Sequence, residues 1–449
     1  MAAIITKDTR VHNAKQFVEA VGETANTTLY TFIGKPTAWA NESAPDTPTD
    51  TFKSQIDIWE NMTALKKVSD GDISLVIPRN AWKTGNVYYQ FNDSVASNTL
   101  FDAQMVVINS NYQVYKCLSN NYGGASSVEP QGTGFVANNI IKHDLISQDG
   151  YIWKYMYTIT TPQWAKFGTS TFMPVSDDST VTTNAANARG IYAYKLTNTS
   201  TSLSTGNHYL RIDGDGTGAN ANITVSSGVI TALRVNDYGS AYSFANIKVT
   251  TAGTSLGSAV IDPICAPAEG HGNSSIEELG GVYAMINTRL EPTDAPEIPV
   301  SGFKFRQVGL LKDPYLYGTT TIPSAPSTYT KLTAYSNVTI GSIQNTGSLL
   351  AGATIRNSTN TANATVVSYS GSVINYIKTR NSSSNVAANY TPFTNGDVLY
   401  VDNAQIGTIT AMGNATVRLR SGEIIYIDNR NVITRASDQV EDLHIVLEF

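Results

Sequence analysis

Cysteine and charge are both scarce in this chain of 449 residues. The two cysteines, Cys117 and Cys265, lie far apart, which excludes a disulfide framework and a zinc site with four thiolates. We expect both to be buried thiols. Charged residues make up 15% of the chain, below the usual share of about a quarter, while hydrophobic residues reach 41%. Disorder driven by charge is therefore excluded.

Basic clusters and long apolar runs are also missing. The chain has 30 Lys and Arg against 36 Asp and Glu, a net charge of -6, and no stretch gathers the positive charge that phosphate binding requires. No window approaches about 18 uninterrupted apolar residues. Residues 1–22 have no basic stretch followed by an apolar run. The sequence therefore predicts no nucleic-acid partner, no membrane span and no standard secretion signal.

Turn-forming and strand-forming residues are abundant instead. Ser, Thr and Asn replace the missing charge, and the chain has 34 Gly and 24 Tyr. This composition is typical of many short strands joined by turns. At about 100 to 200 residues per domain, the length predicts two to four domains. We therefore expect a mainly β protein with several domains.

The N-terminal region carries two helix patterns. Residues 11–21 are amphipathic, and a strand is expected at 29–33, ended by Gly34. A Pro-rich connection, 35–49, follows and excludes regular helix. Beyond it, Asp50 is the expected N-cap of a helix of about four turns. The apolar stripe of this helix should consist of Phe52, Ile56, Trp59 and Thr63.

Aromatic and branched residues between Gly and Asn turns predict the framework strands. These strands are expected at 73–77, 112–118, 151–159, 282–290, 303–311 and 423–428. The last residues alternate, with Leu443, Ile445, Leu447 and Phe449 on one side, which predicts a terminal strand with one buried face.

Two stretches, 185–268 and 318–415, are richer in Ser, Thr, Asn, Gly and Ala than the rest and are interpreted as inserted β modules. Each holds a similar phrase: ANANITVSSGVITALRV begins at Ala219, and TANATVVSYSGSVINYIKT begins at Thr361. Both predict two strands joined by a tight Ser-Gly turn. The similarity has two explanations, common descent of the modules or shared composition.

No catalytic or metal-binding constellation has the required spacing. GDGTG, residues 214–218, leads into alternating residues instead of a helix, so we expect a tight turn. Thr224 stands where a calcium loop needs its bidentate carboxylate. None of the histidines, His12, His143, His208, His271 and His444, pairs with another ligand at metal spacing. We expect no catalytic residue, no metal and no cofactor.

Two further groups have competing interpretations. His271, between two glycines, is either an exposed imidazole or, as we favour, part of a boundary turn. The adjacent acids Glu277 and Glu278 are expected to point apart and to be solvated. Among the aromatics, Trp59 and Trp153 should pack in the core. Trp39 and Trp82, beside prolines or in polar loops, are candidates for partner contact.

Several segments resemble one protein family. LYTFIGKPTAWANESAPDTPTDTFKSQIDIWENMTALKKVSDGDISLVIPRNAW, from Leu29, is similar to the baseplate wedge protein 8 family of contractile-tailed, T-even-like bacteriophages. VYKCL, DGYIWKYMYTI, FRQVGLLKDP, SGEIIYIDNR and the terminal DQVEDLHIVLEF resemble later family segments in the same order. The two Ser/Thr/Asn-rich stretches depart from the family.

The resemblance implies a structural subunit without enzymatic activity, built from β-sandwich domains, dimeric, bridging other baseplate wedge proteins in the virion and assembled in host cytoplasm. The expected framework is discontinuous, possibly two domains, and comprises residues 1–184, 269–317 and 416–449. Candidate partner-interface residues are Trp39, Arg79, Trp82, Arg306 and Arg430. The competing class is a receptor-binding or carbohydrate-binding tail protein, which should carry a carboxylate pair or fibre repeats that this sequence lacks.

Overall fold

The structure of the protein, a computed structural model, describes residues 4–22, 27–137, 140–142, 145–249, 255–300, 302–323, 329–378 and 391–449. It is mainly β, with 40% strand and 16% helix, which confirms the fold class expected from composition. The chain divides into two compact units. Unit 1 comprises Met1–Gln16, Ser74–Met285 and Val446–Phe449; unit 2 comprises Phe17–Ile73 and Ile286–Ile445.

The helices are few and short. The α-helices are α1 (Lys7–Gly22), α2 (Phe52–Asn61), α3 (Ser97–Asp102), α4 (Thr161–Phe167), α5 (Ser179–Asn184) and α6 (Ser275–Glu278). The 3-10 turns are η1 (Asp70–Asp72), η2 (Asn121–Gly123), η3 (Ala185–Ala188), η4 (Pro292–Asp294) and η5 (Thr346–Ser348). Among the described residues, no helix is both long and apolar enough to cross a membrane.

Unit 1 holds most strands of the first two thirds of the chain. They are β4 (Val106–Ile108), β5 (Gln113–Asn120), β6 (Phe135–Ala137), β7 (Ile140–Lys142), β8 (Leu145–Gln148), β9 (Tyr151–Thr158), β10 (Phe172–Pro174), β11 (Tyr194–Asn198), β12 (Gly206–Gly214), β13 (Asn220–Ser226), β14 (Val229–Asp237), β15 (Ala245–Val249) and β16 (Val260–Pro263). β3 (Ile73–Pro78), β17 (Tyr283–Leu290) and β27 (Glu441–Glu448) have residues in both units.

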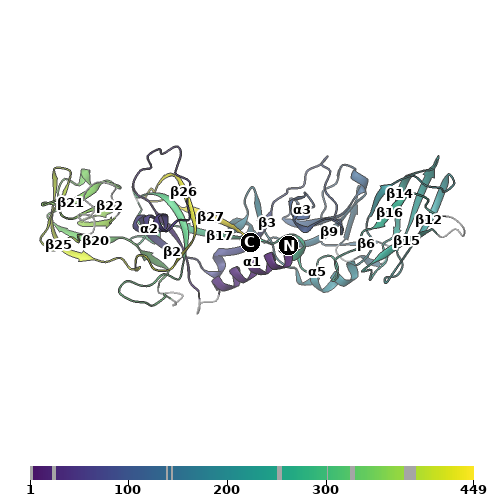
Figure 1. Cartoon of the computed structure of the whole chain (residues 1–449), viewed down its shortest axis with the longest axis horizontal. Coiled ribbons are helices and arrows are strands. Elements are labelled where there is room, and N and C mark those ends of the chain that lie inside the picture. Colours follow the sequence, from purple (N-terminus) through teal and green to yellow (C-terminus); the bar gives the residue numbers. More distant parts are fainter. Residues whose placement is uncertain are drawn as a thin grey trace. The chain divides into compact units, whose positions relative to one another are not determined.

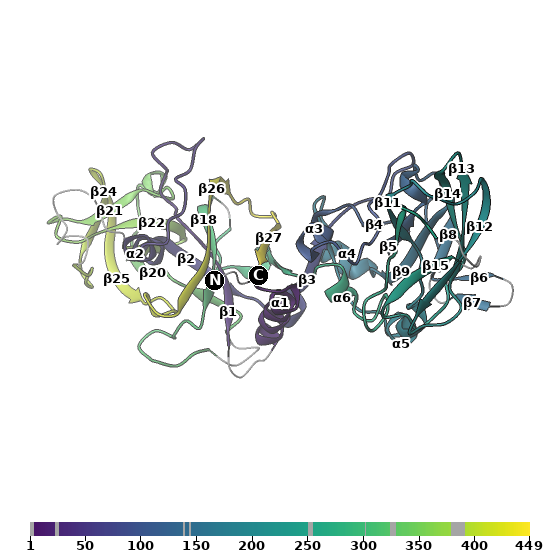
Figure 2. The same cartoon turned by 45° about the vertical axis from the view of Figure 1, so that its right-hand side comes forward.

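Strand pairs in these sheets, such as β5 with β9, β12 with β13 and β3 with β10, are antiparallel. Their orders are β4-β5-β9-β8, β14-β13-β12-β15, β10-β3-β17-β27, β11-β16 and β6-β7. Figure 2 shows β12, β13 and β14 side by side in teal. Their inner faces form one apolar cluster, which includes Leu210, Ile223 and Ile230. A separate cluster around Trp153, Tyr115 and Tyr151 covers β5 and β9.

Unit 2 is built on a five-stranded sheet of order β19-β2-β1-β18-β26. Its strands are β1 (Leu29–Gly34), β2 (Met62–Lys67), β18 (Lys304–Lys312), β19 (Lys331–Thr333) and β26 (Glu423–Thr434). β18 pairs antiparallel with β1 on one side and with β26 on the other. Segments far apart in sequence thus form one core, which includes Tyr30, Trp59, Leu311, Leu332 and Val417.

The remaining strands of unit 2 close a barrel. They are β20 (Ser336–Gly341), β21 (Thr354–Asn357), β22 (Asn363–Ser370), β23 (Val373–Ile377), β24 (Val398–Val401) and β25 (Ala404–Gly413), joined in the order β20-β23-β22-β21-β24-β25. Figure 1 draws the labelled barrel strands β20, β21, β22 and β25 in green to yellow. The barrel covers a shorter part of the sequence than the module expected at 318–415. It begins only at Ser336, because β19 pairs with β2 in the five-stranded sheet.

The two similar phrases both form hairpins with two-residue turns. Ser226 pairs with Val229 across Ser227 and Gly228, which have φ angles of 51° and 74°. Ser370 pairs with Val373 across Gly371, whose φ is 56°. Positive φ at the turn suits the twist of hairpin strands, which explains the glycines. One hairpin lies in an open sheet and the other in the barrel.

Helix α2 differs from its expected form. Thr51 is the N-cap, with its Oγ1 accepting a hydrogen bond from Ser54 N at 3.1 Å, so Asp50 lies outside the helix. The helix ends at Asn61 because the chain then enters β2, so Thr63 belongs to a strand. Phe52 is 87% exposed. The apolar stripe is therefore shorter than predicted and rests on Ile58 and Trp59.

Candidate functional site

The five predicted interface residues fall into two groups. Trp39, Arg306 and Arg430 come together in unit 2, and Arg79 and Trp82 lie in unit 1. In unit 1, the guanidinium of Arg79 sits over the Trp164 ring, 5.0 Å from its centroid. Trp82 is half-buried and donates a hydrogen bond from Nε1 to Ser126 Oγ at 3.1 Å.

The Pro-rich segment 35–49 is held against the sheet by Arg306. This side chain is buried, and its Nε pairs with Glu42 Oε1 at 2.8 Å. Arg306 Nη1 donates to the Pro36 carbonyl at 2.7 Å, and the Trp39 amide donates to the same Glu42 carboxylate. Its planar fork of donors thus binds two points of one loop. The structure gives Arg306 a positioning role beneath the loop.

A second set of contacts ties the loop to strand β26. Trp39 Nε1 donates to the Arg430 carbonyl at 2.9 Å, and Asn429 Nδ2 donates to the Asp46 carbonyl at 2.7 Å. The Arg430 side chain pairs with Asp428 at 2.6 Å. These bonds hold Trp39 half-buried at the edge of the loop.

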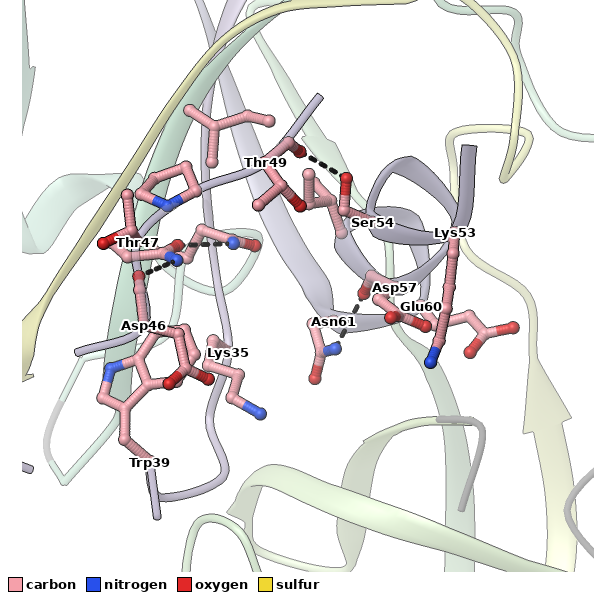
Figure 3. A pocket seen from close by; sticks show the side chains of 15 residues that line it. Lys35, Trp39, Asp46, Thr47, Thr49, Lys53, Ser54, Asp57, Glu60 and Asn61 are labelled. Atoms are coloured by element: carbon pink, nitrogen blue, oxygen red, sulfur yellow. Dashed lines mark hydrogen bonds between the residues drawn. The ribbon is translucent and has the colours of Figure 1, made fainter. Parts of the chain in front are cut away.

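A pocket of about 460 Å³ lies between this loop and helix α2 (Figure 3). One wall carries Trp39, Asp46 and residues 47–49, and the other is formed by α2 side chains such as Lys53 and Asp57. The floor is the sheet itself, where Gln307 of β18 stands opposite Asn429 of β26. The lining carries charges of both signs.

Two polar groups in the pocket are incompletely matched. Gln307 is 6% exposed and donates from Nε2 to Asn429 Oδ1 at 2.8 Å, but its Oε1 has no hydrogen-bond partner among the described residues. Lys35 Nζ lies over the Trp39 ring, 5.0 Å from the centroid. Burial lowers the pKa of Lys35, as does Arg306, while Asp46, Asp57 and Glu42 act in the opposite direction. The lining therefore combines the carboxylates of Asp46 and Asp57 with the amino groups of Lys35 and Lys53.

Unit 1 holds a buried polar cluster that sequence reasoning missed. Lys116 Nζ lies 2.7 Å from Glu278 Oε2 and 3.2 Å from His271 Nδ1, and Lys116 is 1% exposed. Burial and then Lys116 lower the pKa of His271 to about 4. Although burial opposes ionisation of Glu278, Lys116 and His271 lower its pKa to about 2. The only signal for this cluster was a Lys within the apolar strand VYKCL.

Several expectations about titratable groups are corrected by this cluster. His271 lies in a turn, as favoured, but it is 2% exposed and packs against Phe91, so it is not an exposed imidazole. The expectation that Glu278 is solvated is wrong, because helix α6 turns it into the interior against Lys116. Cys117 is buried as expected, whereas Cys265 is only partly buried.

The remaining candidates have structural partners. The carboxylate of Asp215, in the GDGTG turn, accepts hydrogen bonds from the Ser243 and Phe244 amides. The bonds from Ser243 are the main reason why the pKa of Asp215 falls to about 2. Within the described residues, no group of three or more His, Cys, Asp or Glu could hold a metal ion. His143 lies outside the described residues.

Comparison with known families gives one match. Residues 3–146 match the family model Phage-Gp8, whose description is Bacteriophage T4, Gp8. This match confirms the resemblance to the baseplate wedge protein 8 family over those residues. The resembling segments after residue 146 lie outside the matched range. No curated protein matches the chain.

Proposed function

We propose that this chain, related through residues 3–146 to the baseplate wedge protein 8 family of contractile-tailed bacteriophages, is a structural subunit of the baseplate wedge that bridges neighbouring wedge proteins. The family match carries the proposal. The fold supports it, because β-sheet units with extensive apolar cores are suited to static interfaces. The role is non-enzymatic, its site is the virion baseplate, and assembly takes place in host cytoplasm.

The proposed subunit is a homodimer that also contacts other wedge proteins, with neither nucleic acid nor membrane as a partner. Isolated protein at micromolar concentration should scatter light as a dimer. A monomer throughout that range would contradict this part of the proposal.

Localisation tests the function itself. Antibodies against the purified chain should label the baseplate end of the particles whose genome encodes it, and the chain should appear in their protein composition. Its absence from purified tails would contradict the proposal. Depolymerisation of host surface glycans by the pure protein would instead support the alternative, a receptor-binding or carbohydrate-binding tail protein.

A further inference from the structure

Strand β26 forms one edge of the five-stranded sheet in unit 2 and, among the described strands, pairs with β18 alone (Figure 2). With 12 residues it is the longest strand that the structure describes, and none of its residues is buried. Among the described residues, the main chain of 423–434 has one hydrogen-bond partner outside the sheet, the Trp39 indole on the Arg430 carbonyl. Such an edge presents N–H and C=O groups to which a further strand can bond.

Neither the Trp39 contact nor the irregularity of β26 closes this edge. A carbonyl oxygen has two lone pairs, so that of Arg430 can accept a second hydrogen bond. The register with β18 shifts near the start of β26 and again between Asn429 and Ile433. Across the second shift β26 advances four positions while β18 advances two, so the side chains alternate between the faces in the same way before and after it. The stretch 426–433 therefore keeps one alternation throughout.

The geometry of antiparallel strands limits how two copies of β26 can pair. Two residues that exchange main-chain hydrogen bonds face each other directly, and residues that point to the same side of one strand are an even number of positions apart. A two-fold axis that relates two copies must therefore pass beside a residue and not between two residues. The central registers place this axis at one of the residues 427–431.

Charge selects one of these registers. With the axis at Asn429, Asp428 faces the partner's Arg430, and Arg430 faces the partner's Asp428. The two side chains lie on one side of the strand, because they pair within it at 2.6 Å, and both are accessible, at 39% for Arg430 and 29% for Asp428. Opposite charges placed directly across from each other stabilise a strand pair, as does an aromatic residue opposite a β-branched one. Tyr426 facing the partner's Val432 makes the second kind of contact.

The other central registers lose this match. An axis at Asp428 or at Arg430 places like charges opposite each other, which destabilises a strand pair. An axis at Ile427 or at Asn431 places both charges opposite uncharged side chains. The strand is thus complementary to itself in one register, which is what a two-fold interface between identical chains requires. A strand of another protein gains nothing from this symmetry, so the pattern favours a second copy of this chain as the partner.

We infer that two copies of this chain pair through β26, antiparallel and with the two-fold axis at Asn429, so that their five-stranded sheets continue into each other. The inference rests on the proposed function, because it assigns the interface of the proposed homodimer. Val432, which is 39% exposed, is then covered by the partner.

Cysteine crosslinking measures the register. Residues that face each other across antiparallel strands have Cα atoms about 4.5–5.5 Å apart, within the range that a disulfide spans. Cys117 is buried, so only Cys265 is first replaced, by Cys265→Ser. In that background, Asn429→Cys should form a covalent dimer under mild oxidation. Val432→Cys is the matched control, because Val432 faces the partner's Tyr426 and its two copies lie about 20 Å apart along the strands. It should remain uncrosslinked.

A mixture of two variants checks the register away from Asn429, whose side chain also holds the Asp46 carbonyl. Equal amounts of Tyr426→Cys and Val432→Cys chains, both carrying Cys265→Ser, should form a mixed covalent dimer about tenfold faster than either variant forms its own, because only the mixed pair is adjacent. Self-crosslinking of Val432→Cys, or the lack of a mixed product from chains that are dimeric by light scattering, would overturn the inference.

Charge reversal tests what selects the register. Asp428→Arg and Arg430→Asp each place like charges opposite each other, so each should raise the dissociation constant of the dimer about tenfold. The variant with both exchanges restores opposite charges and should recover wild-type dimerisation. Arg211→Asp is the matched control, because Arg211 pairs with Asp213 two positions along β12 in the same way. It should leave the dissociation constant unchanged, and circular dichroism establishes that all four variants fold.

The outcomes separate this interface from the proposed function. If the wild-type chain is a monomer at micromolar concentration, the proposed homodimer fails and the β26 interface fails with it. If the chain is a dimer but ignores both charge reversals, and Asn429→Cys stays uncrosslinked, the homodimer stands and only the β26 interface is wrong.

Discussion

Lys116 and His271 meet in the interior of unit 1, with Nζ of one 3.2 Å from Nδ1 of the other. Both side chains are almost completely buried, and Glu278 is the carboxylate that binds them. Because a second positive charge is costly in so dry a site, burial and Lys116 lower the pKa of His271, and its imidazole stays neutral at pH 7. The arrangement makes the stability of unit 1 depend on pH.

Acidification should destabilise unit 1 through His271. Its folded-state pKa of about 4 lies below the ordinary value of 6.5. The unfolded chain therefore binds more protons between these values, and the contribution of His271 is complete above about pH 6.5 and is lost as pH falls towards 4. Urea melts at pH 7, 6, 5 and 4.5 should show this decline.

Two variants isolate the contribution of this histidine. His271→Gln keeps a neutral polar side chain but cannot titrate, so the free energy of unfolding should fall less between pH 6.5 and 4. His12, exposed on α1, is the matched control for the substitution itself, and His12→Gln should change the free energy of unfolding at pH 7 by less than about 0.5 kcal/mol. Identical slopes in wild type and His271→Gln would contradict the assignment.

Trp59 should contribute far more to stability than Phe52, the first residue of the same helix. Trp59 is 6% exposed in the core of unit 2, and Phe52, also on α2, is 87% exposed. Trp59→Ala should lower the free energy of unfolding by about 3–5 kcal/mol. Phe52→Ala should change it by less than about 0.5 kcal/mol. Denaturant melts measure both, and a loss below about 1 kcal/mol for Trp59→Ala would disagree with its position.

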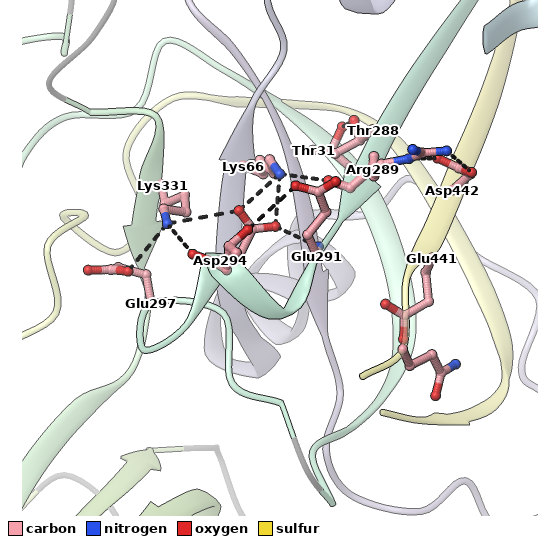
Figure 4. Close-up of polar contacts among 12 residues, drawn as sticks. Thr31, Lys66, Thr288, Arg289, Glu291, Asp294, Glu297, Lys331, Glu441 and Asp442 are labelled. Atoms are coloured by element: carbon pink, nitrogen blue, oxygen red, sulfur yellow. Dashed lines mark hydrogen bonds and ion pairs between the residues drawn. The ribbon is translucent and has the colours of Figure 1, made fainter. Parts of the chain in front are cut away.

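Asp294 provides a test of a half-buried ion pair. Its carboxylate, 7% exposed, lies 2.8 Å from Lys66 Nζ, and Lys331 approaches it from the other side (Figure 4). Asp294→Asn should cost about 2–3 kcal/mol, below the value for a fully buried pair because both lysines are partly exposed.

Asp442 is the matched control for Asp294. It pairs with Arg289 through two hydrogen bonds of 2.8 and 2.9 Å, but Arg289 is 55% exposed. Surface pairs contribute at most about 1 kcal/mol, so Asp442→Asn should be close to neutral. Equal losses in the two variants, measured by denaturant melts, would show that burial does not decide the strength of these pairs.

Removal of the barrel should leave the rest of unit 2 folded. The chain enters and leaves near one point, because Thr333 N donates to Thr416 Oγ1 at 2.6 Å. Replacing 336–413 with a short Gly/Ser linker should yield a soluble protein that unfolds cooperatively. Circular dichroism during thermal unfolding measures this.

A longer deletion is the comparison for the barrel. Replacing 319–416 also removes β19 and fully buried Leu332 from the five-stranded sheet. That variant should be less stable by several kcal/mol, since loss of one buried Leu costs about 2–5 kcal/mol. Equal stability of the two deletion variants would contradict a contribution of β19 to the core.

Local patterns predicted the framework strands and the two hairpins closely, since alternation and turn residues act over a few positions. The cap of α2 was missed by one residue, because Asp50 and Thr51 are both good caps and only the chain path selects one. The hydrogen bond from Trp39 to Arg430 joins residues 391 positions apart. The burial of Glu278 depends on a helix of only 4 residues. Periodicity carries no signal for such contacts.

Two buried lysines on neighbouring strands allow the opening of unit 1 to be measured by chemical labelling. Lys116 and Lys154 face each other on β5 and β9 and are 1% and 0% exposed. An amine-acylating reagent can modify them only after the strands separate or the interior opens, whereas surface lysines react at once. The rate at which these two residues acquire label therefore measures the frequency of opening of unit 1 under native conditions, without denaturant.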